Sequence, residues 1–222
     1  MRFTYFLSAF LATLAIASPI SSGVDVAEGA DLIARAGKTG KPTGNPTNKP
    51  DKEVKTPEFA ALERVHPNPQ NGQYYWVYQK DRLGAKILDG DTESLDELQQ
   101  LQKRLGFEHV GVIVGQVVFT EKTSKKEGKT TTKDFKAIYY HMTMNKDKGN
   151  AAVVHASNWE AKRVDFSKSF LENGGQTNKR GSEKAKTNSK NYISDDIKHH
   201  QIYDIDNNNC NTFAQAIRAA FS

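Results

Sequence analysis

Cysteine is almost absent from this chain: Cys210 is the only one among 222 residues. A single cysteine excludes an intramolecular disulfide framework and any zinc site built on a Cys-x-x-Cys pair. Charge of one sign is not in large excess either. The 31 Lys and Arg residues against 26 Asp and Glu give a net charge of +5, which weakly favours anionic partners and decides nothing about the fold. The hydrophobic fraction of 37% excludes collagen, a coiled coil and full disorder.

The N-terminus has the pattern of a signal peptide. Met1 and Arg2 precede the uncharged apolar run FTYFLSAFLATLAIA, and Ala15-Ile16-Ala17 fits the small-x-small cleavage rule. The run is shorter than the ~20 apolar residues that a membrane-spanning helix needs, and no later segment is long enough. We therefore expect residues 1–17 to be removed and the protein to be secreted and extracellular.

Residues 18–57 are expected to form a disordered leader or propeptide, because Pro, Gly, Thr, Asn and Lys dominate the second half of the segment. An intact leader and a propeptide cleaved after Arg35 both fit the sequence. The folded domain is expected to span residues 58–222 as a single unit. No internal repeat is evident.

The pattern of residues 58–222 predicts an α+β fold with an antiparallel sheet packed against helices. The clearest helix lies in TESLDELQQLQKRLGF, where leucines recur every three or four residues and Gly106 marks the end. A shorter helix is expected in EFAALERV. The predicted strands are QYYWVYQ, HVGVIVGQVVF, FKAIYYHMTM and AAVVHA. Residues 120–134 are predicted to be a long hairpin loop, and residues 173–191 a basic loop.

Cys210 is predicted to begin a helix on which Phe213, Ile217 and Phe221 share a face, with Asn209 as the N-cap. Unpaired N–H groups and the helix dipole at this position favour a thiolate and lower the thiol pKa. The same N–H groups can stabilise an oxyanion after attack on a carbonyl. The alternative is that Cys210 is a small buried hydrophobe, against which its asparagine-rich flanks argue.

The segment NNNCNTFAQAI, preceded by IYDI, resembles the cysteine box of the circularly permuted papain-like superfamily, which includes the PPPDE isopeptidases and the lecithin:retinol acyltransferase branch. In that superfamily the catalytic histidine comes first, at the start of a strand, and EHVGVIVG at residues 108–115 is similar to that element. The resemblance covers about 25 residues in these two boxes. It implies a permuted papain-like core, with Cys210 as nucleophile and His109 as its base.

The resemblance also suggests a second histidine on the next strand. His141 fits that position, although residues 120–134 make the spacing longer than is usual in the superfamily, and His155 is the competitor. A structural role for either histidine fits the sequence at least as well. Viewed alone, His109 can equally be a solvated residue that follows a helix. The histidines lack the ligand spacing of a zinc site, and we expect neither a metal nor a cofactor.

A basic region offers a rival function. Its cations are Lys162, Arg163, Lys168, Lys179, Arg180, Lys184, Lys186 and Lys190. A secreted basic protein of this kind can be a ribonuclease-like toxin that uses His109 and His141 as acid and base. The simpler interpretation is that these residues lie in solvated loops, and no interleaved aromatic residues support base stacking.

The sequence therefore predicts a monomeric, secreted thiol hydrolase or acyltransferase that acts on an amide or ester through Cys210 and His109. The expected partner is a peptide, isopeptide or acyl substrate, with weak binding to anionic surfaces and no membrane span. Peptide, isopeptide, cell-wall amide and lipid ester substrates all stay open. A non-catalytic secreted interaction or effector protein and a basic ribonuclease-like toxin are the alternatives.

Overall fold

A computed structural model describes residues 51–85, 96–126, 128–194 and 198–221. The predicted signal peptide and the cleavage point after Arg35 lie outside the described residues. Along this part of the chain the helices and strands follow in the order β1 (Lys52–Lys55), α1 (Pro57–Val65), β2 (Tyr74–Asp81), α2 (Asp96–Leu105), β3 (His109–Ser124), β4 (Gly128–Asn145), β5 (Ala151–Asn158), β6 (Ser169–Thr177), α3 (Lys179–Asn191) and α4 (Cys210–Arg218).

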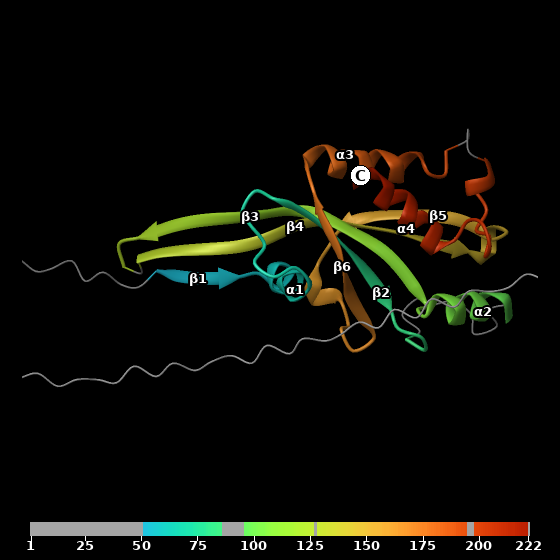
Figure 1. The fold of residues 1–222 in the computed structure, drawn as a ribbon, viewed down its shortest axis with the longest axis horizontal. Helices are drawn as coiled ribbons and strands as arrows, with labels where there is room; N and C mark the ends of the chain where they lie inside the picture. The colour runs from blue at the N-terminus through green and yellow to red at the C-terminus, as the bar shows by residue number, and fades with distance from the viewer. Residues whose placement is uncertain (1–50, 86–95, 127, 195–197, 222) are drawn as a thin grey trace, which may run out of the picture. The chain divides into compact units, whose positions relative to one another are not determined.

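The six strands form one mixed sheet that curls into a half-barrel and packs with the four helices of the described residues, which confirms the α+β class. The strand order is β1-β4-β3-β2-β6, and β5 pairs with the C-terminal half of β4, from Ile138 to Asn145. All pairings are antiparallel except the one between β1 and β4, which is parallel. The expectation of a purely antiparallel sheet was therefore wrong for β1. Figure 1 shows β3 and β4 as the longest strands, with β1 beside β4.

Three local predictions were wrong. Residues 52–57 were expected to belong to a disordered leader, but they form β1 and the start of α1, which Thr56 caps by accepting a hydrogen bond from the Phe59 N–H. Residues 120–134 are largely strand, because β3 and β4 continue on either side of a short turn. Residues 173–191 contain the end of β6 and the 13-residue helix α3.

Both faces of the sheet are covered. Helices α3 and α4 pack on the face that includes Val110, Val112 and Val114, where Phe213 and Ile217 are fully buried. Helix α1 covers the other face, where its buried residues meet β2 and β3 through side chains such as Val77 and Ile113. The start of β3 therefore lies deep in the protein, and this position determines the chemistry of its first residue. No helix among the described residues is long and apolar enough to cross a membrane.

Candidate active site

Cys210 is the first residue of α4, as the sequence predicts. The Asn209 side chain accepts hydrogen bonds from the backbone N–H groups of Asn211 and Thr212, at 3.0 and 3.2 Å, and the Thr212 hydroxyl accepts one from the Asn209 N–H at 2.8 Å. This capping box fixes the start of the helix. Cys210 is a free cysteine and only 4% exposed. Its thiol therefore lies inside the protein at a helix N-terminus.

His109 and His141 are brought into direct contact. His109 is the first residue of β3, and His141 lies on the neighbouring strand β4, opposite Gly111. The Nε2 atom of His109 is 3.1 Å from Nδ1 of His141, a hydrogen bond between the two rings. His109 is 5% exposed. It is therefore not the solvated residue that its position after a helix allowed.

The thiol lies where β3 and β4 separate. The pairing between these strands begins at Gly111 and His141, although β3 itself begins at His109. The backbone N–H of Val110 interacts with the Cys210 sulfur and lowers the thiol pKa. Among the described residues, no hydrogen bond joins that sulfur to the His109 ring. The structure therefore places the thiol against the backbone of β3 at Val110, the residue that follows His109.

Burial dominates the protonation of the thiol. It raises the pKa of Cys210, while hydrogen bonds from the Val110 N–H, the Tyr203 hydroxyl and the Asn211 N–H lower it by less. The expectation that the helix N-terminus leaves a lowered pKa was wrong, because desolvation of the charged form exceeds the stabilisation by these donors. Cys210 is a neutral thiol at neutral pH.

The histidines are also held neutral. Burial lowers the pKa of His109 to about 4, with a smaller contribution from repulsion by His155. Burial, followed by repulsion from His109 and His155, lowers the pKa of His141 to about 3. A pair of neutral imidazoles at pH 7 can act as a base and accept a proton, but neither ring is protonated and able to act as a general acid.

His155 extends this arrangement by one strand. It lies opposite His141 in the β4–β5 register, and the two rings stack with centroids 4.6 Å apart. Its Nε2 atom is 2.8 Å from the Thr143 hydroxyl. The hydrogen bond to His109 is thus made by His141, whereas His155 supports the ring of His141. Of the two candidates for a third residue, His141 is the one that contacts His109.

Two tyrosines near the site escaped the sequence analysis. The Tyr203 hydroxyl accepts a hydrogen bond from the Cys210 N–H at 3.3 Å, and burial raises its pKa. The Tyr139 ring stacks on His141, with centroids 4.7 Å apart. A Cβ atom on Gly111 would lie 2.5 Å from the Tyr139 ring, so glycine is needed at this close approach. Tyr203 belongs to the IYDI segment of the resemblance, although no role was predicted for it, and no sequence signal singles out Tyr139 from the eight tyrosines in the chain.

The asparagines before Cys210 are structural. Asn208 is 1% exposed, and its side-chain amide donates to the backbone oxygens of His200 and Ile202 at 2.8 and 2.6 Å. Its side-chain oxygen accepts a hydrogen bond from the Tyr192 hydroxyl at 3.0 Å. These bonds fix the loop that leads into α4. The polar flanks thus belong to a buried, satisfied network and do not by themselves indicate an exposed thiol.

Part of the basic region forms a helix. Lys179 and Arg180 begin α3, where Lys179 lies 3.9 Å from Glu183. An acid–base pair that cleaves RNA needs one protonated imidazole, whereas His109 and His141 are in contact and both have lowered pKa values. The geometry therefore argues against the ribonuclease alternative. No group of His, Cys, Asp or Glu side chains within the described part of the chain is arranged to hold a metal ion.

Comparison of the chain with models of protein families, with curated proteins and with solved structures found no match. The resemblance to the permuted papain-like superfamily thus depends on the residues around His109 and Cys210 alone, and membership stays a prediction.

Proposed function

We propose that the protein is a thiol hydrolase or acyltransferase in which Cys210 is the nucleophile, His109 is the general base and His141 orients His109. One observation carries the proposal. A cysteine at the N-terminus of α4 lies beside the backbone of Val110, and the residue before it, His109, is hydrogen-bonded through Nε2 to a second histidine at 3.1 Å. Nucleophile, base and orienting group are the three parts that covalent acyl transfer requires.

The lowered pKa of His109 and the raised pKa of Cys210 determine how the first step proceeds. The resting pair is a thiol and an imidazole, so the proton leaves the sulfur as the sulfur–carbon bond forms. The proposed mechanism uses the tautomer in which His109 donates its Nε2–H to His141, because His109 then presents Nδ1 as the proton acceptor. Catalytic hydrogen bonds are often long before substrate binds, and the imidazole and thiol close up in this step.

The backbone around the thiol can stabilise the intermediate. The N–H groups of Val110 and Asn211 both lie close enough to the sulfur to lower its pKa. When the carbonyl carbon bonds to sulfur, its oxygen becomes an anion that such N–H groups can stabilise. The protonated His109 then gives its proton to the leaving amine or alcohol, which leaves a thioester on Cys210. Water, or another acceptor activated by His109, releases the acyl group and restores the thiol.

The proposed setting is extracellular, and the proposed substrate is a peptide, isopeptide or acyl amide or ester. Both proposals are supported by sequence features, namely the apolar run before Ser18 and the resemblance around Cys210. The proposal includes the permuted papain-like core, a site that needs no metal or cofactor, and a monomeric enzyme.

A non-catalytic interaction protein is the second candidate, and one observation favours it. The Cys210 side chain packs in the same core cluster as Phe213 and Ile217, and burial raises its pKa. A cysteine that only fills space has these two properties. The proposal must therefore be tested by a reaction of the thiol that burial alone does not allow.

The test is acyl transfer to Cys210, followed by intact-mass measurement with an activated ester as the acyl donor. The folded protein is expected to gain one acyl group, lost again in hydroxylamine, and to gain it faster than the same protein in denaturant. Cys210→Ser is expected to gain none. His109→Gln, checked for folding by circular dichroism, is expected to slow acylation by roughly 10²-fold or more. Acylation only after denaturation would establish Cys210 as a structural residue and reject the enzyme.

A further inference from the structure

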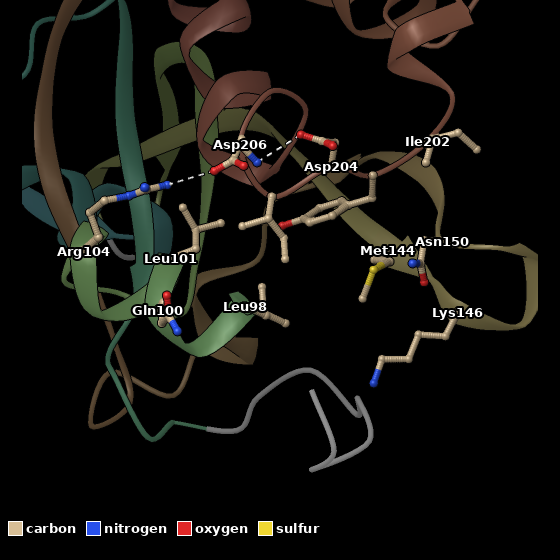
Figure 2. A pocket seen from close by; sticks show the side chains of 12 residues that line it. Leu98, Gln100, Leu101, Arg104, Met144, Lys146, Asn150, Ile202, Asp204 and Asp206 are labelled. Carbon is tan, nitrogen blue, oxygen red and sulfur yellow. Dashed lines mark hydrogen bonds and ion pairs between the residues drawn. The ribbon is translucent and has the colours of Figure 1, made fainter. Parts of the chain in front are cut away.

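A cavity of about 480 Å³ opens beside the candidate active site. Helix α2, the end of β4 and the loop before α4 form its walls, as Figure 2 shows. The lining residues are Leu98, Gln100, Leu101, Arg104, Met144, Lys146, Asn150, Ile202, Tyr203, Asp204, Ile205 and Asp206. A space of this size accommodates a ligand of one or two amino-acid residues.

Tyr203 connects this cavity to the nucleophile. It lines the cavity, and its hydroxyl accepts the hydrogen bond from the Cys210 N–H. One side chain therefore separates a bound ligand from the residue that carries the thiol. A group that fills the cavity can lie next to the scissile bond.

The apolar part of the lining comes from three elements. Leu98 and Leu101 project from α2, and Met144 projects from the end of β4 (Figure 2). Ile202 adds a large apolar side chain that is 52% exposed. Solvent-exposed apolar surface of this kind inside a concavity favours an apolar ligand group.

The positive and negative side chains of the lining are equal in number. Arg104 lies 3.7 Å from Asp206 (Figure 2), and Lys146 and Asp204 add one further cation and one further anion. One Asp204 oxygen is already engaged, because it accepts hydrogen bonds from the backbone N–H groups of Asp206 and Asn207 at 3.0 and 2.7 Å. This balance favours a neutral ligand over a strongly anionic or cationic one.

We infer that this cavity binds a bulky apolar side chain of a neutral peptide substrate, adjacent to the carbonyl that Cys210 attacks. The inference rests on the proposed function and adds the substrate class. Polar groups such as those of Gln100 and Asn150 can pair with peptide N–H and C=O groups. A saturated acyl chain would leave the polar lining without partners, at a cost in binding free energy.

The test compares matched fluorogenic amides that differ only in the acyl part: acetyl-Leu, acetyl-Gly, acetyl-Glu and octanoyl. The acetyl-Leu amide is expected to be hydrolysed with a kcat/KM about 10- to 200-fold above that of the acetyl-Gly amide, the range that filling an apolar pocket gives. The acetyl-Glu and octanoyl amides are expected to be poor substrates. An octanoyl amide that surpasses acetyl-Leu would overturn the peptide assignment in favour of a lipid acyl group.

Leu98→Trp fills the cavity without touching Cys210 or His109. It is expected to lower kcat/KM for acetyl-Leu by roughly tenfold, and for acetyl-Gly by less. Leu83→Trp is the matched control, because Leu83 is 49% exposed and does not line the cavity. It is expected to hydrolyse both substrates at the unaltered rate. Equal sensitivity of the two substrates to Leu98→Trp would reject the cavity as a recognition site and leave the catalytic proposal standing.

A binding experiment tests the cavity independently of the proposed catalysis. Cys210→Ala protein titrated with N-acetyl-leucine methylamide is expected to show NMR shift changes at residues that line the cavity, and these should disappear with Leu98→Trp. Shift changes of this kind, combined with no amide hydrolysis by the unaltered protein, would support the cavity and reject the enzyme. No shift change at these residues would reject the cavity.

Discussion

The two halves of the β3–β4 hairpin differ in almost everything except their secondary structure. In the near half, residues 109–115 are all buried, and the strand is covered on both faces. In the far half, residues 120–124 are all exposed, and within the described part of the chain the outer side of β4 is paired there only with the four residues of β1. Figure 1 shows this far half extending away from the helices.

This difference determines what the polar residues can do. His109 and His141 in the near half are desolvated, which lowers their pKa values to about 4 and about 3. Charged residues in the far half form exposed ion pairs instead, such as Lys129 with Glu121 at 2.8 Å. Buried groups have perturbed reactivity, whereas solvated groups keep ordinary chemistry. The candidate chemistry thus belongs to the near half, although both halves belong to the same two strands.

The largest expected effect follows from the nucleophile. Cys210→Ser keeps the size of the side chain but replaces a thiol with a hydroxyl that His109 alone activates poorly, so turnover should fall by at least about 10³-fold. Lys122→Gln with Lys125→Gln, both exposed in the far half, should leave turnover unchanged. Hydrolysis of the acetyl-Leu amide measures both. Loss of turnover in the lysine variant would contradict the assignment of the chemistry to the near half.

The next effect separates His141 from His155. His141→Gln removes the group that holds Nε2 of His109, and kcat should fall roughly 10²-fold because the base is misplaced. His155→Gln removes only the ring that stacks on His141, so kcat should change by a few fold at most. Because a purely structural role would lower stability without changing the pH dependence, the pH profile of kcat is measured alongside. Equal losses in both variants would contradict the assignment of His141.

A pH effect on stability should follow from the same burial. The folded protein holds His109 and His141 with pKa values of about 4 and 3, whereas the unfolded chain protonates them near 6.5. Below pH 6.5 the unfolded chain therefore takes up protons that the folded protein does not. The free energy of unfolding is highest above pH 6.5 and decreases as the pH falls towards 4. His109 alone accounts for a loss of roughly 3 kcal/mol between pH 7 and pH 4.

Urea unfolding at pH 7, 6, 5 and 4 measures this loss. The double variant His109→Gln with His141→Gln should flatten the pH dependence, whereas His199→Gln, at an exposed position, should retain it. Burial also raises the pKa of the Asp81 carboxyl, and the comparison between variants removes the contribution of such groups. An unchanged slope in the double variant would show that the histidines are not buried as neutral groups.

The sequence predicted the near half better than the far half, for a physical reason. Apolar residues at strand or helix spacing indicate burial, and His109, His141 and Cys210 are all flanked by such patterns. Strand β1 (KEVK) is exposed throughout and forms only because it pairs with β4, a contact that no local signal encodes.

Helix α3 was missed for a related reason. Its buried positions are Gly181, Ala185 and Ser189, small residues at a spacing of four that an apolar count overlooks. The resemblance left His141 and His155 as alternatives for a second histidine, and strand pairing explains why His141 is the one that contacts His109. The raised pKa of the Cys210 thiol was not expected, because the depth at which a helix N-terminus is buried depends on what packs over it.

The smallest expected effects lie in the far half, where Lys133 is 2.7 Å from Glu53 on β1. Glu53→Gln removes an exposed ion pair, and at physiological salt it should not change the melting temperature measurably. Lys133→Ala should cost more, about 0.5–1 kcal/mol, because the Lys133 ammonium also lies over the rings of Phe59 and Phe119, at 5.8 and 5.1 Å. Thermal unfolding of both variants measures the difference. A larger loss in Glu53→Gln would show that the ion pair, not the ring contacts, holds β1 against the hairpin, and that the far half depends on charge more than its exposure indicates.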